Sequence, residues 1–459
     1  MAQRYSSLAY TDPHDLVFGR SKRPVTCGFD LKIGDGLVLP EVNFTLPVID
    51  VVPENWARIR EHYEEMGRNI LKRAVALQVP GIVLEFELLP AMTETPQWGA
   101  EITAILHRHL QTAHEQLGLK CALRVTPTDI RDQGKPPLLR SGPAWEKLKQ
   151  SFELCRDAGA DILSIESVGS KEVHDQALLY GNIRGIVFAL GVLAPRDMAW
   201  LWQQISAVCG QGKRRVIAGG DTACGFANTA MQLAHQKMLP EVLAAVVRAM
   251  SAARSLVAFE NGAVGPSKDC AYEGPMIKAI TGCPIAMEGK SATCAHFSPL
   301  GNIASAMCDL WSNESVQNVR LLSGNAPEAY AETLAYDCRL MNVATARGEA
   351  SRLRDWLTES DQWLSPQAAI LSPSAVHRIA NAVISTPDTY RRTVAAGQAA
   401  IAILRDGETV GSLKLAPKEQ NWLRRIGDEL DSLPDTEAAL IDEMTELYGE
   451  FFSAESYGL

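Results

Sequence analysis

Short apolar runs alternate with longer amphipathic stretches through most of the chain. The first amphipathic stretch, from Trp56 to Leu77, has apolar residues every three or four positions, which indicates a helix, and Pro80-Gly81 ends it. The short runs are rich in Val, Ile and Leu and show little polar alternation, as expected of strands that are buried on both faces. They predict eight strands, at residues 82–86, 121–125, 161–167, 185–193, 215–219, 256–260, 285–288 and 319–322. Further helices are predicted between them, at residues 97–117, 143–158, 171–181, 196–209, 228–253, 271–281, 299–312 and 327–345.

Eight strands that alternate with helices predict an α/β fold, the (β/α)8 TIM barrel. The alternative is an open doubly wound sheet, which normally carries a Gly-rich phosphate loop after its first strand. Here the first predicted strand is followed by Glu-Leu-Leu-Pro, and this favours the barrel. The first 50 residues read as an irregular lead-in. Beyond residue 345 no strand is predicted, and helices are expected at residues 349–363, 374–384, 388–406, 417–432 and 435–452. We therefore predict a barrel with an N-terminal extension at residues 1–345 and an all-helical C-terminal module at residues 346–459.

The charge and the hydropathy of the chain argue against some classes of function. The net charge is −10 and no basic run of five residues occurs, which argues against a nucleic-acid partner because such binding relies on Lys and Arg. The N-terminus lacks the apolar core of a signal peptide, and the longest apolar stretch, near residues 186–194, is shorter than a bilayer span. We expect a cytoplasmic protein with no membrane partner. The sequence leaves a homo-oligomer open.

Three residues that follow predicted strands could together bind a metal ion. Glu166 ends the run at 161–167, Cys224 follows the run at 215–219, and Cys270 closes the Gly-rich loop after 256–260. In a barrel these positions lie at the mouth, where active sites form. Two thiolates and one carboxylate favour zinc, and three protein ligands leave a fourth position open, as in catalytic zinc sites.

Each of these residues can also be explained without a metal ion. Glu166 alone could belong to a hydrogen-bond network in the barrel, and the ten cysteines, which form no CxxC pair, are mostly expected to be small buried residues rather than disulfide partners. Cys283 and Cys294 are the main alternatives to the proposed ligand pair. His296 is more typical of a structural hydrogen-bond donor than of a ligand.

Several longer motifs resemble the zinc-containing methanol–corrinoid methyltransferases. The similar stretches run along the chain and read Leu-Pro-Glu-Val-Asn at 39–43, Ser-Ile-Glu-Ser at 164–167, Gly-Asp-Thr-x-Cys at 220–224, Gly-Pro-x-Lys-Asp-Cys at 265–270, Met-Glu-Gly-Lys-Ser-x-Thr-Cys-Ala-His at 287–296, Trp-Ser-Asn-Glu-Ser at 311–315 and Glu-Thr-Leu-Ala-Tyr-Asp-Cys at 332–338. The resemblance implies a barrel fold, a catalytic zinc ion and a partner corrinoid protein. It places Glu166, Cys224 and Cys270 on the family's zinc-ligand positions. The chain departs from the family at Ser170, where glycine is expected, and at Ala223, where an acidic residue is expected.

The function that this resemblance implies is zinc-dependent transfer of the methyl group of methanol to the Co(I) corrinoid of a partner protein. No cobalamin-binding Asp-x-His-x-x-Gly motif occurs in the chain, so the corrinoid is expected on a separate subunit. Glu85, Asp221 and Asp269 are the candidate acids that could assist departure of the methanol oxygen. The rival hypotheses are the same reaction with another methyl donor such as a methoxylated compound, a zinc hydrolase, and a non-catalytic scaffold that binds a corrinoid protein.

Overall fold

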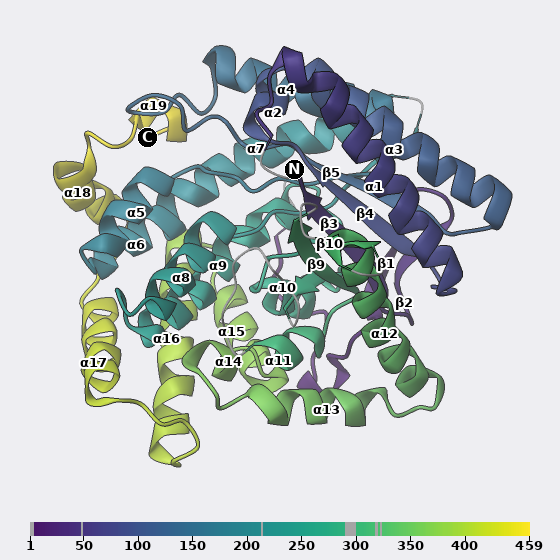
Figure 1. Ribbon diagram of the computed structural model, residues 1–459. Coiled ribbons are helices and arrows are strands. Elements are labelled where there is room, and N and C mark those ends of the chain that lie inside the picture. Colours follow the sequence, from purple (N-terminus) through teal and green to yellow (C-terminus); the bar gives the residue numbers. More distant parts are fainter. Residues whose placement is uncertain (1–3, 47–48, 213, 290–299, 317–319, 322–323) are drawn as a thin grey trace.

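The main sheet is parallel and curls into a barrel. The computed structural model describes residues 4–46, 49–212, 214–289, 300–316, 320–321 and 324–459. In these residues the sheet has seven strands in the order β7-β6-β5-β4-β3-β9-β8, and helices surround it (Figure 1). Its strands are β3 (Leu39–Thr45), β4 (Ile82–Glu87), β5 (Cys121–Thr126), β6 (Ile162–Leu163), β7 (Ile217–Ala218), β8 (Ala286–Glu288) and β9 (Leu310–Val316).

A loop backbone lies beside β7, on the side where an eighth strand would close the sheet. The amide of Val264 donates to the carbonyl of Ala218 at 2.8 Å, and the amide of Gly265 donates to the carbonyl of Gly219 at 2.8 Å. Gly265 has φ 81°, and a Cβ there would lie 2.5 Å from the carbonyl oxygen of Pro284, just before β8. Only glycine allows this approach. The loop thus bridges β7 and β8, and the predicted α/β barrel is confirmed.

Two of the predicted strands are wrong. Residues 185–193 form α6 (Ile183–Phe188) and the π-helix η3 (Ala189–Leu193), and residues 256–260 form the last turn of α9 (Glu241–Glu260). Both segments are buried. A helix that is apolar on all sides shows no 3.6-residue pattern, so a short window of it resembles a buried strand.

The strands that replace them lie elsewhere in the chain. The expected irregular lead-in contains β3 and a hairpin of β1 (Arg20–Cys27) and β2 (Leu31–Asp35). β9 starts within the segment that was predicted as helix 299–312, where the helix α11 covers only Gly301–Ser305. The predicted strand at 319–322 corresponds to β10 (Arg320–Leu321), which pairs with β11 (Gly324–Asn325) outside the main sheet.

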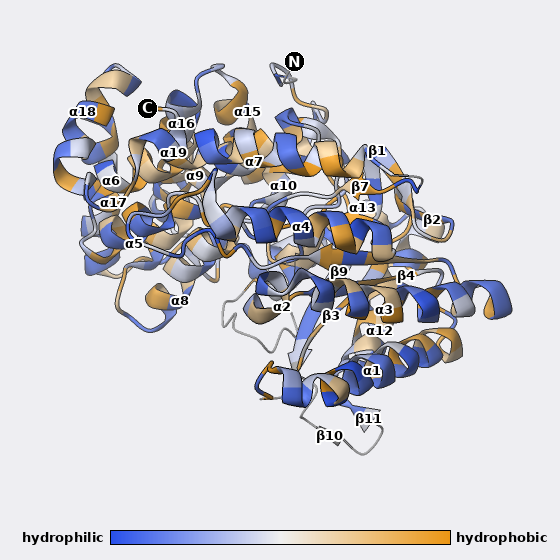
Figure 2. Ribbon diagram, turned by 90° about the horizontal axis from the view of Figure 1, so that it is seen from above, coloured by the Kyte–Doolittle hydropathy of each residue, from blue (hydrophilic) through white to orange (hydrophobic). Residues whose placement is uncertain are grey.

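Most helices were predicted correctly, and most of these helices bury one apolar face and expose a polar one. Figure 2 shows hydrophilic and hydrophobic residues alternating along α1, α3 and α4. The barrel helices are α1 (Trp56–Ala76), α2 (Pro90–Glu94), α3 (Pro96–Leu117), α4 (Gly142–Ala158), α5 (Lys171–Leu179), α7 (Ala194–Cys209), α8 (Thr229–His235), α10 (Gly274–Thr281) and α12 (Ala326–Ala346).

The chain beyond α12 is helical in the structure, as expected. Its helices are α13 (Ala350–Asp361), α14 (Pro366–Ala369), α15 (Pro373–Ile384), α16 (Thr389–Thr409), α17 (Pro417–Asp431), α18 (Glu437–Tyr448) and α19 (Ala454–Tyr457). Helix α16 packs on α9, and the buried ion pair between Arg392 and Glu260, at 2.8 Å, ties the two together. The division into two domains at residues 345/346 stays a prediction.

Two helical segments are long and apolar enough to cross a bilayer, judged by length and composition alone. They are Ile183–Cys209 and Glu241–Glu260, and the apolar windows of these segments are 83% and 100% buried inside the protein. They are therefore core helices of this globular fold, and packing against other helices accounts for their apolar composition.

The amino end of the barrel is closed by an apolar cluster, which we call the floor. Each of the seven strands contributes one inward apolar side chain to it, and the β1–β2 hairpin covers them with three more. Its members are Leu39, Val83, Ala122, Ile162, Ile217, Ala286 and Leu310 from the sheet and Cys27, Leu31 and Ile33 from the hairpin.

Candidate metal centre

The inward positions above the floor are polar, and they lead towards the carboxyl end of the strands, which we call the mouth. Because side chains alternate along a strand, Glu85 and Glu87 of β4 point to the same side. In the sheet register, Asn43 of β3 and Arg124 of β5 both lie opposite Glu85. Arg124 is fully buried, and its Nε lies 2.7 Å from Oε1 of Glu41. This ion pair lies one inward position above the floor.

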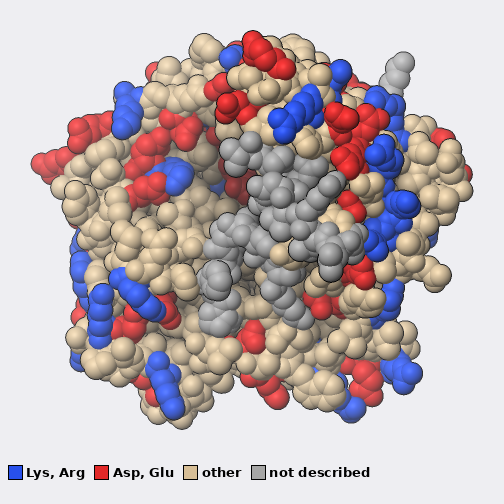
Figure 3. Space-filling model, viewed as in Figure 1, with Lys and Arg blue, Asp and Glu red and all other residues tan. Residues whose placement is uncertain are grey.

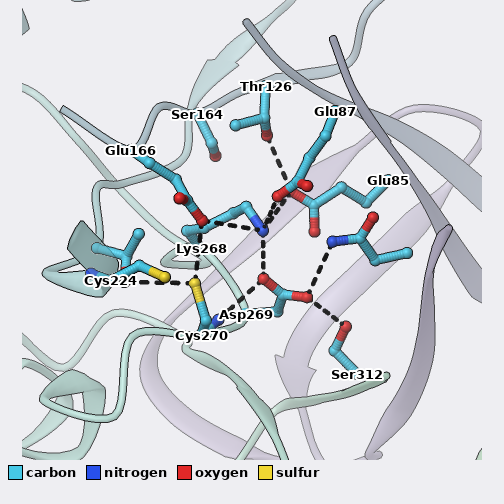
Figure 4. Close-up of polar contacts among 12 residues, drawn as sticks. Glu85, Glu87, Thr126, Ser164, Glu166, Cys224, Lys268, Asp269, Cys270 and Ser312 are labelled. Carbon is cyan, nitrogen blue, oxygen red and sulfur yellow. Dashed lines mark hydrogen bonds and ion pairs between the residues drawn. The ribbon is translucent and has the colours of Figure 1, made fainter. Parts of the chain in front are cut away.

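The three candidate zinc ligands meet at the mouth. The ligand atoms of Glu166, Cys224 and Cys270 all lie within 4.8 Å of one another, and Sγ of Cys270 is 3.1 Å from Oε1 of Glu166. Figure 4 shows the carboxylate and the two sulfur atoms converging. Glu166 follows β6, Cys224 begins the π-helix η4 (Cys224–Asn228) after β7, and Cys270 lies in the loop that precedes α10.

The chemistry of this trio fits a divalent cation. Enclosure by protein raises the pKa of Glu166 to about 7. Hydrogen bonding to Cys224, together with burial, raises the pKa of Cys270 well above its usual value. The hydrogen bond with Cys270 lowers the pKa of Cys224, but burial and the charge of Glu166 raise it more. All three groups are therefore harder to ionise when no cation is near, and a divalent cation that displaced their protons would stabilise the ionised forms.

A buried lysine connects the trio to the deeper carboxylates. Nζ of Lys268 lies 3.2 Å from Oε1 of Glu85 and 3.7 Å from Oε1 of Glu166, and it forms still closer ion pairs with Glu87 and Asp269. Figure 4 shows this ammonium group at the centre of the carboxylates. Burial alone would lower the pKa of Lys268, but the surrounding carboxylates, Asp269 first, raise it well above its usual value. Lys268 is therefore charged and offsets part of the negative charge of the site.

Two of the three candidate acids lie in this network, and their pKa values are shifted in opposite directions. Burial, followed by the charge of Asp269, raises the pKa of Glu85 well above its usual value. Burial also tends to raise the pKa of Asp269, but Lys268 outweighs it and the pKa is lowered. Asp269 accepts a hydrogen bond from Ser312 at 2.9 Å. The environment thus favours the protonated form of Glu85 and the ionised form of Asp269.

The third candidate acid, Asp221, lies in a separate network. Its carboxylate accepts hydrogen bonds from the indole of Trp202 at 3.0 Å and the amide of Thr222 at 2.8 Å, and it pairs with Arg254 at 3.3 Å. These contacts fix the loop that leads to Cys224. The structure therefore does not bring Asp221 together with Glu85 and Asp269.

Of the two alternative cysteines the structure describes Cys283, which is not part of the trio. Cys283 is buried before β8, at the amino end of that strand, and its amide donates to the hydroxyl of Thr281 at 3.1 Å. Cys294 and His296 lie outside the described residues.

Sequence reasoning missed several residues of the site. Glu41 and Arg124 pair inside the barrel, and Asn228 lies beside Cys224 with its amide nitrogen 3.4 Å from Sγ. A charged residue within an apolar run is the signal that could have found the first two. The local signal for Asn228 is its spacing of four residues from Cys224, whereas its partners Cys270 and Arg248 come from other elements.

The two departures from the family pattern have structural settings. Ser170 has φ 78°, a left-handed conformation that glycine adopts without cost. The amide of Ala223 donates to Oε1 of Glu273 at 2.8 Å, and Ala223 itself is fully buried. Glu273 thus supplies a buried acidic group next to the position where an acidic residue was expected.

The fold and the trio define an α/β-barrel protein with a candidate thiolate–carboxylate metal centre at its mouth. Over residues 2–458 the chain matches the family of the methanol-cobalamin methyltransferase B subunit (MtaB), and it belongs to that family. It is 39% identical over 464 residues to the methanol–corrinoid protein co-methyltransferase of Methanosarcina barkeri, and the alignment covers 100% of this chain and 99% of that protein. It also superposes with a TM-score of 0.95 and 38% identity, over 100% of both chains, on a chain from the crystal structure of the methanol:cobalamin methyltransferase complex MtaBC from Methanosarcina barkeri.

Proposed function

We propose that this protein is a zinc-dependent methyltransferase that moves the methyl group of methanol to the Co(I) corrinoid of a partner protein. Membership of the family over the whole chain supports the reaction. The convergence of Glu166, Cys224 and Cys270 within 4.8 Å is the observation that supports the metal. The reaction breaks the C–O bond of methanol and forms a cobalt–carbon bond, and the oxygen must take up a proton to leave as water.

Cys224, Cys270 and Glu166 would hold zinc and leave one coordination position for the substrate. When bound, zinc supplies a Lewis acid for the hydroxyl oxygen of methanol. Three anionic ligands give the zinc site a formal charge of −1. This charge disfavours loss of the methanol proton, and a neutral alcohol is a better source of the methyl group than an alkoxide.

Glu85 is the best candidate for the proton donor. It is buried, and its pKa is raised well above the usual value. Its Oε1 accepts a hydrogen bond from Thr126 at 2.9 Å, whereas Oε2 has no hydrogen-bond partner among the described residues. A proton on Oε2 would therefore be available for transfer. Asp269 is ionised beside Lys268 and is the weaker candidate.

The mouth must also admit the corrinoid of the partner, since the chain has no cobalamin-binding motif of its own. On the face shown in Figure 3, the basic side chains that are drawn are scattered among acidic and neutral ones rather than gathered into a patch of the kind that binds nucleic acid. We place the reaction in the cytoplasm.

The test is methylation of cob(I)alamin under anaerobic conditions, followed by the absorbance change to methylcobalamin. Zinc-replete protein with methanol is expected to give methylcobalamin, and a chelator is expected to abolish the activity until zinc is restored. Methylation by a methoxylated donor but not by methanol would contradict the proposed substrate. Failure with every donor, even with a corrinoid protein supplied, would favour the non-catalytic scaffold.

A further inference from the structure

A buried asparagine contacts both cysteines of the candidate metal centre. Asn228 ends η4, four residues after Cys224, and is 2% exposed. Its Nδ2 lies 3.4 Å from Sγ of Cys224 and 3.4 Å from the carbonyl oxygen of Cys270. The amide can thus donate one hydrogen to the sulfur and the other to the backbone of the second ligand residue.

An arginine fixes which end of this amide faces the sulfur. Nη2 of Arg248, on α9, lies 2.6 Å from Oδ1 of Asn228. A guanidinium group has only donors, so it must meet the amide oxygen. The NH2 group of Asn228 then faces Cys224, and the opposite orientation would set donors against donors.

Arg248 itself is held in place from several sides. It is fully buried, its guanidinium lies 5.0 Å from the ring centre of Tyr272, and Nη1 is 3.8 Å from Oε2 of Glu273. Its Nε approaches Oε1 of Gln367 at 3.5 Å. Only Asn228 therefore separates the buried positive charge of Arg248 from Cys224. The two thiolates and one carboxylate of the centre together carry more negative charge than a divalent ion can neutralise.

We infer that Asn228, oriented by Arg248, is a positioning residue of the metal centre that donates an N–H···S hydrogen bond to the Cys224 thiolate. The inference rests on the proposed zinc function. The hydrogen bond holds the sulfur in the direction of the metal and withdraws electron density from it. A less electron-rich thiolate leaves zinc more electrophilic towards methanol. Such outer-shell hydrogen bonds commonly change metal affinity or activity by about 10- to 100-fold.

Cobalt substitution tests the hydrogen bond without an activity assay. Co²⁺ replaces zinc in the purified protein, and the thiolate-to-cobalt charge-transfer band is recorded for the natural protein and for Asn228→Ala. Loss of the hydrogen bond is expected to move the band to lower energy, because a more electron-rich sulfur gives up its electron more easily. Zinc retention against a chelator is expected to fall by about 10- to 100-fold.

Two further variants separate this role from a purely structural one. Asn228→Asp keeps the shape of the side chain and its contact with Arg248 but turns an acceptor towards the sulfur. It is therefore expected to shift the band in the same direction and to weaken zinc binding. This variant replaces Asn228→Ala in the test if the alanine variant does not fold. Asn342→Ala is the matched control: Asn342 bonds the amide and carbonyl of Val38 at 2.8 and 2.9 Å, away from the trio. It should lower stability and leave the band unchanged.

The outcomes distinguish the inference from the function on which it rests. If the natural protein binds cobalt without a thiolate charge-transfer band, the proposed metal centre fails. If the natural protein shows the band, and folded Asn228→Ala and Asn228→Asp both keep its energy and their zinc affinity, only the positioning role is overturned.

Discussion

The two ends of the barrel are built from the same strands in opposite ways. At the floor, one inward apolar side chain from each strand packs against the β1–β2 hairpin, and its members are almost fully buried. At the mouth, the next inward positions of the same strands carry Glu85, Glu87 and Arg124, and loops add Lys268 and Asp269. The floor is stabilised by removing apolar surface from water. The mouth consists of buried charges that must be paired, at a cost in desolvation.

This difference indicates a division of roles. Stability should depend mainly on the floor and on the helices around the sheet, and metal binding on the mouth. Substitutions in the two regions should therefore separate the free energy of unfolding from zinc affinity and activity.

The largest effect is expected from Cys270→Ala. Removal of one of two thiolates should abolish stoichiometric zinc binding and reduce methanol-dependent methylation to background, while the circular dichroism spectrum stays that of a folded barrel. Cys283→Ala, at the amino end of β8, should keep both zinc and activity. Full zinc content in Cys270→Ala, measured by metal analysis, would show that the ligands have been assigned wrongly.

Two buried lysines allow a matched test of charge at the two ends. Lys268 lies among the carboxylates at the mouth, whereas Lys278 binds the carbonyls of Val17 and Met307 and the carboxylate of Asp309, whose other oxygen contacts the start of β8. Replacement of either lysine by Met leaves a buried carboxylate unpaired and should cost about 3–5 kcal/mol of unfolding free energy.

Only Lys268→Met should also change zinc binding. It removes an ammonium group that lies 3.7 Å from Oε1 of Glu166, so zinc should bind more tightly. Chelator competition on both variants provides the measurement. Equal zinc affinities for Lys268→Met and Lys278→Met would contradict the electrical coupling of Lys268 to the candidate ligands.

Ile33→Ala tests the floor directly. Ile33 is fully buried in the hairpin, and the cavity left by truncation should lower the free energy of unfolding by about 2–5 kcal/mol. Zinc affinity should not change. Val25→Ala, which removes a partly buried side chain at the edge of the same cluster, should give a smaller loss. Denaturant titration measures both, and a loss of zinc in Ile33→Ala would break the proposed separation of roles.

The floor side also carries a pH response. Burial lowers the pKa of His107 to about 4, and its ring stacks on Phe29 with centroids 5.3 Å apart. As the pH falls, the unfolded chain binds a proton near pH 6.5 while the folded protein does so only near pH 4. The contribution is thus complete above pH 6.5 and is lost down to pH 4. His107→Phe should lose less stability than the natural protein between pH 7 and 5 in thermal melts; an equal loss would rule out this residue as the source.

The smallest effect is expected at Ser170, beside the mouth. Its φ of 78° is unfavourable for serine, and its hydroxyl has no hydrogen-bond partner among the described residues. Ser170→Gly should therefore raise the free energy of unfolding, by about 0.5–1 kcal/mol. Ser170→Ala retains the strained conformation and should give no gain. A loss of stability in Ser170→Gly would indicate that the hydroxyl makes a contact in solution.

Local patterns predicted the amphipathic helices and several strands well. The segment from Trp56 to Ala76 shows its helix directly, because its buried residues recur every three or four positions. The pattern failed at α9, which is buried on all sides, and at β3, whose inward positions include Glu41 and Asn43 and thus break the apolar run that signals a buried strand.

The local sequence patterns also identified part of the candidate site. Glu166 was identified because it lies at the end of one correctly predicted strand, and Cys224 because it follows another. Cys270 was identified because its loop was expected to follow a strand at 256–260. That segment is a helix, but the loop does lie beside the carboxyl end of β7. The convergence of the three ligand atoms agrees with the assignment, and their role as zinc ligands stays a prediction.

The sequence by itself determined the class of fold, the family resemblance and the residues able to bind a soft metal, because these depend on local periodicity, on order along the chain and on residue type. Only the tertiary structure decided which charges face one another. Lys268 meets Glu85 and Glu87 of β4 and Glu166 from the loop after β6, and Arg248 reaches Asn228 from a neighbouring helix. The closure of the barrel sets the distances between these side chains, and no local pattern in the sequence predicts them.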